Sequence, residues 1–308
     1  MSVTPKYSLR YFIGKALYRL ACKATSYVAR LTERKFLSSQ GIISYFIHKN
    51  QGKPMLVFLH GFNGNKELWL STVFPLRSTH GVLIPDLPGH GASDNPENGD
   101  YRLEAYASAI TELLLAEGIT NYCLVGSSMG CAVAANLIRG SVSNIHALFF
   151  ISPFGITERQ IRKIRNFRKG TNSPFIVKDI DDYKAFFQTV VHKPLRIPGW
   201  VKYYLAIDHI RRNEHIEVMF DALVTSNECL STLQKERIPL IVLAGRADVV
   251  VDTDCFTFLE NQLYDCQLHW LSNIGHLPML EAPKRLATAI QYLLPCSLTN
   301  RKYYLGDS

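Results

Sequence analysis

The segment that most clearly predicts chemistry is YCLVGSSMGC (122–131), where two serines stand between two glycines. In the pattern G-x-S-x-G, the nucleophilic serine has a glycine two residues before it and another two residues after it. Ser128 meets this condition through Gly126 and Gly130, whereas Ser127 has neither glycine. Bulky side chains at the glycine positions would clash in the strained turn that exposes the nucleophile. Ser128 is therefore the predicted nucleophile.

The surroundings of this motif favour a nucleophile over a simple turn. An apolar run precedes Gly126, and small residues typical of a helix follow over 129–139. A helix that starts at the nucleophile points its N-terminus at the reacting centre, so the Met129 N–H would donate to an oxyanion. The alternative is a glycine-flanked turn whose serine caps the helix.

A serine hydroxyl needs a base, and the position of His276 fits that role. When the nucleophilic serine lies at a strand-to-helix turn, the base is expected later in the sequence, on a loop after a late strand. His276 lies in such a loop, NIGHLPMLEAP (273–283), which follows a predicted strand and precedes the last helix. His269 lies within the strand itself, where packing is the expected role. The remaining candidates are expected to organise turns (His60, His90) or to lie on the surface of an insertion (His192, His209, His215).

The base in turn needs an acid that fixes its tautomer and stabilises the imidazolium. The segment PLIVLAGRADVVVD (239–252) places Asp248 shortly after a buried strand, at the end of the sheet where ligands gather. Asp252 and Asp254 are alternatives, although both lie closer to the next helix and suit its N-cap. Asp248 is the favoured partner of His276.

A second oxyanion donor is expected from the loop after an early strand. The segment VFLHGFNGNKELW (57–69) contains Gly61, which allows a close turn. The backbone N–H of Phe62 would then face the same site as the N–H of Met129.

Short apolar segments alternate with helical ones over most of the chain, which predicts a mostly parallel sheet covered on both faces. The predicted strands are 42–49, 55–60, 81–87, 122–126, 147–153, 239–245 and 267–272. The predicted helices are 68–77, 101–117, 129–139, 253–263 and 282–294. The stretch 155–236 lacks this alternation of strands and helices and is richer in charged and aromatic residues, so it is expected to be a mainly helical insertion.

Four separated segments together resemble the α/β-hydrolase fold superfamily, over roughly residues 40–296. They are HGF (60–62), GSSMG (126–130), AGRADVV (244–250) and NIGHLPMLEAP (273–283). Within it, the chain looks most like the monoacylglycerol lipase and esterase branch and related bacterial lipases. The resemblance implies a triad of Ser128, Asp248 and His276, an oxyanion hole at Phe62 and Met129, and a cap at 155–236. It implies neither a metal nor an organic cofactor.

The expected function is therefore hydrolysis of carboxylic esters through an acyl-enzyme, on monoacylglycerol-like or other lipid esters. A carbon–carbon bond hydrolase or a thioesterase on the same scaffold is an alternative, and a ligand-binding protein without activity is another. One residue departs from the family pattern. Relatives usually have a second glycine directly after the elbow, where this chain has Cys131, and this raises the question of whether the thiol narrows the pocket.

The basic charge of the chain is concentrated near its N-terminus. The chain has 308 residues and a net charge of +8, and residues 1–35 contain eight Lys and Arg residues against one acidic residue, Glu33. The remainder is nearly neutral, which argues against nucleic acid as a partner. Residues 8–34 have helical periodicity with an apolar face and interspersed basic residues. This pattern suits either a helix docked on the body or one that lies on an anionic membrane surface, and a targeting segment is a third possibility.

The seven cysteines show no C-x-x-C pattern, which favours buried free thiols in a reducing compartment. No apolar run reaches the roughly 18 residues typical of a membrane-spanning helix. The expected location is cytoplasmic. Residues 8–34 would in addition allow peripheral contact with a membrane. The expected organisation is an amphipathic helix at 1–40, a core at 41–154 and 237–296, a cap at 155–236 and a tail at 297–308.

Overall fold

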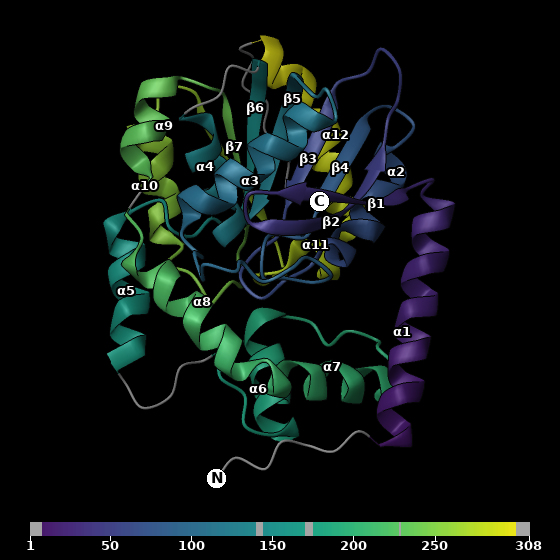
Figure 1. Cartoon of the computed structure of the whole chain (residues 1–308). Helices are drawn as coiled ribbons and strands as arrows, with labels where there is room; N and C mark the ends of the chain where they lie inside the picture. The colour runs from purple at the N-terminus through teal and green to yellow at the C-terminus, as the bar shows by residue number, and fades with distance from the viewer. Residues whose placement is uncertain (1–7, 140–143, 170–174, 228, 300–308) are drawn as a thin grey trace.

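The central feature of the fold is an eight-stranded sheet in the order β1-β2-β4-β3-β5-β6-β7-β8 (Figure 1). The computed structural model describes residues 8–139, 144–169, 175–227 and 229–299. The strands are β1 (Thr32–Ser38), β2 (Gly41–His48), β3 (Met55–Leu59), β4 (Gly81–Pro85), β5 (Asn121–Ser127), β6 (Asn144–Ile151), β7 (Leu240–Gly245) and β8 (Cys266–Leu271).

Strands β3 to β8 run parallel, and β2 joins β4 in the antiparallel sense. Every residue of β4 and β7 is buried, as expected for parallel strands covered on both faces. Two apolar cores lie on opposite faces of the sheet. One face is covered by α3 (Leu103–Ala116), α4 (Met129–Ile138) and α10 (Asp254–Gln262), and the other by α2 (Leu70–Leu76), α11 (Pro278–Glu281) and α12 (Pro283–Thr299), with the short 3₁₀-helix η1 (Lys66–Trp69) before α2. The predicted fold class is confirmed.

The insertion between β6 and β7 is helical and lies beyond the end of the sheet (Figure 1). Its helices are α5 (Glu158–Lys169), α6 (Ile180–Val190), α7 (Gly199–Arg211), α8 (Asn213–Thr225) and α9 (Leu230–Glu236). We refer to residues 155–236 as the cap. The cap covers the edge of the sheet where the carboxyl ends of the parallel strands meet, which is where open α/β sheets bind ligands.

The N-terminal segment differs from the prediction of one helix over 8–34 within an arm of residues 1–40. Helix α1 is Leu9–Val28, and the left-handed backbone of Arg30 (φ 56°) then turns the chain. The next residues form β1, which pairs antiparallel with β2 at the edge of the sheet. The charged sequence of β1 suits an edge strand, because exposed charges oppose pairing with another chain.

Helix α1 packs on the cap through a narrow face of small and aromatic residues. An added Cβ at Gly14 would lie 2.1 Å from the carbonyl oxygen of Trp200 in α7, so the two helix backbones are in direct contact. Beside this point the ring of Tyr204 lies 5.3 Å from that of Tyr11 and 5.6 Å from that of Tyr18. Arg10 joins this contact, because its guanidinium lies 4.6 Å from the centre of the Tyr203 ring, whereas Arg19 and Lys23 are exposed.

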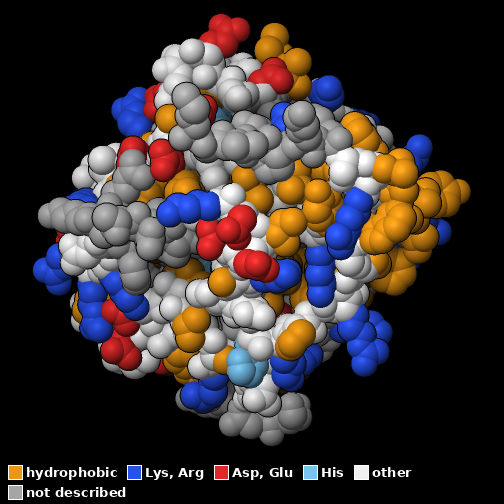
Figure 2. All heavy atoms as spheres, turned by 90° about the horizontal axis from the view of Figure 1, so that it is seen from below, with side chains coloured by type: hydrophobic (Ala, Val, Ile, Leu, Met, Phe, Trp, Pro, Cys, Tyr) orange, Lys and Arg blue, Asp and Glu red, His pale blue; other side chains and the backbone are white. Residues whose placement is uncertain are grey.

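The apolar face that the periodicity predicted for α1 points away from the protein. Leu9, Leu20 and Tyr27 are 76%, 66% and 83% exposed, and Phe12 and Leu17 are also exposed. Figure 2 shows hydrophobic side chains interspersed with Lys and Arg along one edge of the face seen from below. No helix within the described residues combines the length and apolar character needed to cross a bilayer.

The contact at Gly14 yields a stability prediction. Gly14→Val would drive its side chain into the Trp200 carbonyl, and such overpacking costs about 1 to 3 kcal/mol. Ala16→Val, on the exposed face of α1, should lower the free energy of unfolding by no more than about 0.7 kcal/mol, the difference in helix propensity. Urea unfolding of both variants measures the difference. Equal effects would show that the α1–α7 contact contributes little.

Candidate active site

Ser128 lies at the sharp turn between β5 and α4, with an unusual backbone conformation. Its φ of 50° and ψ of −118° place it outside the regions that non-glycine residues prefer. The flanking glycines make the turn possible. A Cβ at Gly126 would lie 2.7 Å from the Cys131 backbone nitrogen, and one at Gly130 would lie 2.3 Å from the Leu59 carbonyl oxygen. The two glycines are therefore sterically required, as the motif predicts.

Cys131 is buried within α4 and does not line the cavity beside Ser128. Its thiol lies 3.8 Å from the carbonyl oxygen of Ile151 in β6, to which the Ser128 N–H also donates at 2.9 Å. Burial raises the pKa of the Cys131 thiol well above its ordinary value, so it stays protonated. The Cys131 side chain fills space between α4 and the sheet, and it does not narrow the cavity beside Ser128. None of the cysteines with described side chains forms a disulfide, and the side chain of Cys296 lies outside that part.

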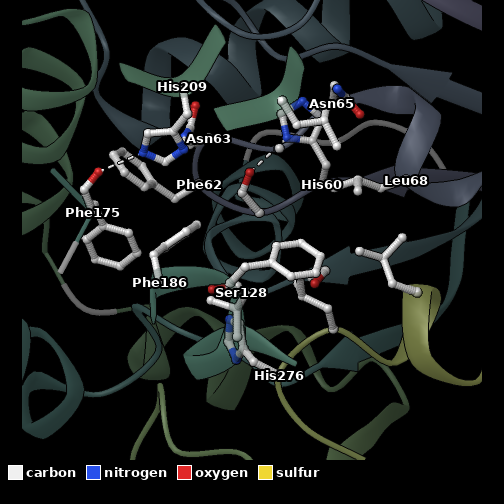
Figure 3. A pocket seen from close by; sticks show the side chains of 18 of the residues that line it. His60, Phe62, Asn63, Asn65, Leu68, Ser128, Phe175, Phe186, His209 and His276 are labelled. Carbon is white, nitrogen blue, oxygen red and sulfur yellow. Dashed lines mark hydrogen bonds between the residues drawn. The ribbon is translucent and has the colours of Figure 1, made fainter. Parts of the chain in front are cut away.

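His276 and Asp248 form a buried pair at the ends of the last two strands. The Nδ1 of His276 lies 2.8 Å from a carboxylate oxygen of Asp248, and both residues are less than 10% exposed. The other carboxylate oxygen accepts a hydrogen bond from the Val250 N–H at 2.9 Å. The structure thus brings together the two residues that the sequence analysis selected, and Figure 3 shows the His276 ring beside Ser128.

The pKa of Asp248 lies below its ordinary value. Burial alone would raise it, but the charge interaction with His276 and the hydrogen bonds from His276 and the Val250 N–H outweigh that effect. The carboxylate therefore stays ionised and holds Nδ1 of His276 as the protonated nitrogen. This leaves Nε2 free to act as a base toward a hydroxyl.

The two alternative acids lie elsewhere. Asp252 and Asp254 both bind the guanidinium of Arg159 in α5, at 2.7 and 3.2 Å. They connect the cap to the loop after β7 and form no pair with His276 among the described residues.

The loop after β3 runs against the nucleophile. A Cβ at Gly61 would lie 3.1 Å from the Cβ of Ser128, and the Gly64 N–H donates to the Gly61 carbonyl at 3.0 Å, which closes the turn. Gly61, the residue before Phe62, therefore lies against Ser128. Met129 is the first residue of α4, so its N–H has no acceptor within the helix. Both predicted oxyanion donors thus come from segments adjoining Ser128.

A cavity of about 300 Å³ contains Ser128 and His276 at its wall. Its lining is mainly apolar and aromatic. In Figure 3, Phe175 and Phe186 of the cap lie to one side of Ser128, and Leu68 lies to the other. Helix α1 also contributes to the lining, through Tyr18 and Cys22.

His209 was expected on the surface, and this expectation is wrong. It is 4% exposed and lines the cavity, together with Asn63 and Arg212. Sequence reasoning missed all three residues. A signal existed along α7 and the residue that follows it, because Leu205, His209 and Arg212 follow one another at helical spacing and line the same cavity. Asn63 gave a second signal, since asparagine tolerates the left-handed backbone found there (φ 53°).

His60 organises the turn after β3, as predicted. The Leu87 N–H donates to its Nε2 at 3.0 Å, so the proton is on Nδ1, which donates to the Gly61 carbonyl at 2.8 Å. Burial lowers the pKa of His60 to about 4. The ring therefore stays neutral and holds the loop that carries Phe62.

No group of three or more His, Cys, Asp or Glu side chains within the described residues is arranged to hold a metal ion.

Residues 56–289 match the sequence profile of the Alpha/beta hydrolase family, and the chain belongs to this family. It is 29% identical to Lipase 1 of Psychrobacter immobilis over 234 residues, which cover 75% of this chain and 73% of the relative. It is 24% identical to human monoacylglycerol lipase ABHD6 over 250 residues, covering 77% and 74%. A crystal structure of a membrane phospholipase A superposes with a TM-score of 0.87 at 24% identity, covering 93% of both chains.

The buried His60 predicts a pH dependence of stability. The pKa falls from 6.5 in the unfolded chain to about 4 in the folded protein, so the unfolded chain binds more protons between these values. His60 should therefore lower the free energy of unfolding by up to about 1.4 kcal/mol for each unit of pH between about 6.5 and 4. His60→Asn should reduce this slope in urea unfolding between pH 7.5 and 5. The same variant at pH 8 gives the pH-independent cost, and an unchanged slope would contradict the assignment.

Proposed function

We propose that this protein is a serine hydrolase that cleaves carboxylic esters of lipids through an acyl-enzyme on Ser128. The single observation that carries this proposal is the hydrogen-bonded pair of Asp248 and His276 beside Ser128 at the wall of an apolar cavity. The similarity to lipases and monoacylglycerol lipases supports the same conclusion.

The proposed reaction has two halves that share one geometry. His276 Nε2 takes the proton of Ser128 as its Oγ attacks the ester carbonyl, and the carbonyl electrons move onto the oxygen. The N–H groups of Phe62 and Met129 stabilise this oxyanion. His276 then donates its proton to the departing alcohol. Water, activated by the same histidine, attacks the acyl-enzyme and releases the carboxylic acid.

The role of Asp248 is electrostatic. Its lowered pKa keeps it charged near neutral pH, so it stabilises the imidazolium that forms as Ser128 is deprotonated. The imidazolium charge is present in the transition state and not in the ground state, so Asp248 stabilises the transition state more. This difference in stabilisation accelerates the reaction.

The cavity supports a lipid as substrate. Phe175, Phe186 and Phe187 of the cap provide aromatic walls that suit an alkyl chain. Monoacylglycerols are the substrates we propose to test first, because relatives in the comparisons carry that activity in their names. The carbon–carbon hydrolase, thioesterase and ligand-binding alternatives are less well supported, since these relatives are named as lipases.

The serine pair allows a matched test of the nucleophile. Ser128→Ala should lower kcat on a short-chain ester by at least about 10³-fold, because the covalent route is lost. Ser127→Ala should retain activity within about threefold, since Ser127 is buried next to the nucleophile and its hydroxyl has no partner among the described residues.

Labelling by a fluorophosphonate probe adds a second measurement, and it should be lost in Ser128→Ala alone. Wild-type activity or labelling in Ser128→Ala would refute the proposed nucleophile. Failure of the folded wild type to label or to hydrolyse any ester would favour the ligand-binding alternative.

We further infer that the outer face of α1 contacts an anionic lipid surface. This face combines exposed Leu9, Phe12 and Leu20 with nearby Arg19 and Lys23, as in helices that lie in a membrane interface. Because α1 also lines the catalytic cavity, the contact would place that cavity close to the lipid.

Point substitutions test the lipid contact better than removal of the segment, since α1 contributes to the cavity wall and β1 to the sheet. Leu9→Glu with Leu20→Glu should weaken flotation with phosphatidylglycerol-containing liposomes at least tenfold, because each buried leucine contributes about 1.5 kcal/mol. Leu37→Glu is the matched control, as Leu37 is 75% exposed on β1. Equal loss in both, or no loss in the α1 variant, would exclude α1 as the contact.

A further inference from the structure

Asn63 directly follows Phe62 and makes hydrogen bonds across the cavity to the cap. Its side-chain oxygen accepts from a guanidinium nitrogen of Arg212 at 2.9 Å, and its side-chain nitrogen lies 3.2 Å from Nδ1 of His209. Its left-handed backbone (φ 53°) turns the side chain away from the path of the loop. Asn63, which follows the predicted oxyanion donor Phe62, is thus hydrogen-bonded to the cap.

These contacts define both the amide orientation and the histidine tautomer. Arg212 only donates, so the Asn63 oxygen must face it and the amide NH₂ must face His209. Nδ1 of His209 is then an acceptor, and its proton is on Nε2, which donates to the Phe175 carbonyl at 2.9 Å. The network is fully satisfied only while His209 is neutral.

The surroundings of His209 favour that neutral form. Burial lowers its pKa, and the Arg212 charge adds to this effect, while the Phe175 carbonyl and Asp208 oppose it. Asp208 also accepts a hydrogen bond from Arg212 at 3.1 Å, and the ring of Tyr183 lies 5.6 Å from that of His209. Asn63, His209, Arg212 and Asp208 therefore each have a hydrogen-bond partner in the cluster.

The network joins segments that are distant in sequence. Asn63 belongs to the core loop after β3, His209 lies near the end of α7, and Arg212 lies between α7 and α8. Figure 3 shows Asn63, His209 and Phe175 grouped beside Phe62, with the bond from His209 to Phe175 drawn.

We propose that Asn63, His209 and Arg212 are positioning residues that fix the oxyanion loop against the cap. This inference rests on the proposed function, because it assigns the network to the alignment of the Phe62 N–H. The network acts on the transition state: a donor held in place before the oxyanion forms needs no reorganisation when the charge appears. A loop released from the cap would lose this advantage while the apolar cavity still bound the substrate.

The test begins with Asn63→Gly, which removes the side chain and keeps the left-handed backbone. It should lower kcat on a short-chain ester roughly tenfold to a hundredfold and change KM less than about threefold, because a displaced oxyanion donor affects the transition state alone. His209→Leu should have the same effect. His209→Gln should stay within about threefold of the wild type, since its amide can accept from Asn63 and donate to the Phe175 carbonyl. Thermal unfolding checks that each variant folds.

Asn63→Asp provides a signature that a general loss of structure would not give. The new carboxylate still pairs with Arg212, but it can bind His209 only when Nδ1 carries a proton. The activity of this variant relative to the wild type should therefore rise at least threefold as pH falls from 8 to 6, because a nearby carboxylate favours the protonated histidine.

Two results would overturn the proposal: Asn63→Gly with kcat within twofold of the wild type, or His209→Gln as impaired as His209→Leu. A measurement independent of activity is the ¹⁵N NMR spectrum of the His209 ring, which should show the neutral Nε2–H tautomer at pH 7. The Nδ1–H tautomer would refute the network even if the wild type hydrolysed no ester. An inactive wild type would refute only the proposed function, whereas an active wild type with unaffected variants would refute only this inference.

Discussion

The strained backbone of Ser128 is the constraint around which the rest of the site is arranged. A non-glycine residue keeps this conformation only when its neighbours enforce it. The Ser128 N–H donates to the Ile151 carbonyl of β6, and the missing side chain of Gly130 lets the end of β3 approach the first turn of α4. Three neighbouring strands therefore meet at one residue, and the loop carrying Phe62 lies beside Ser128 as a result.

Buried polar groups around this turn are matched with specific partners. His60 remains neutral between a carbonyl and an N–H, whereas Asp248 remains charged because His276 and a backbone N–H compensate for its burial. A neutral imidazole and a charged carboxylate thus persist within one apolar region because each group has its own hydrogen bonds. The cap contributes a third example, in which Arg212 fixes the orientation of Asn63 and hence the tautomer of His209.

The parts of the site that were predictable from sequence are those with local signals. The glycines around Ser128 and the loops that follow buried strands placed Ser128, Asp248 and His276 in sequence order, and the fold class followed from the strand and helix alternation. The position of His209 and the direction of the apolar face of α1 depend on packing between distant helices. Periodicity gives a face but not its orientation, and the edge strand β1 was missed because its charged residues lack the usual apolar pattern.

The direct contact of α1 with α7 has a consequence for how the enzyme would meet its substrate. With the Trp200 carbonyl where a Gly14 side chain would stand, the backbones of the two helices touch at this point. Both helices also line the cavity beside Ser128, α1 through Tyr18 and Cys22 and α7 through Tyr204 and His209. A change in the α1–α7 contact would therefore also alter the wall of the cavity in which an ester must reach Ser128.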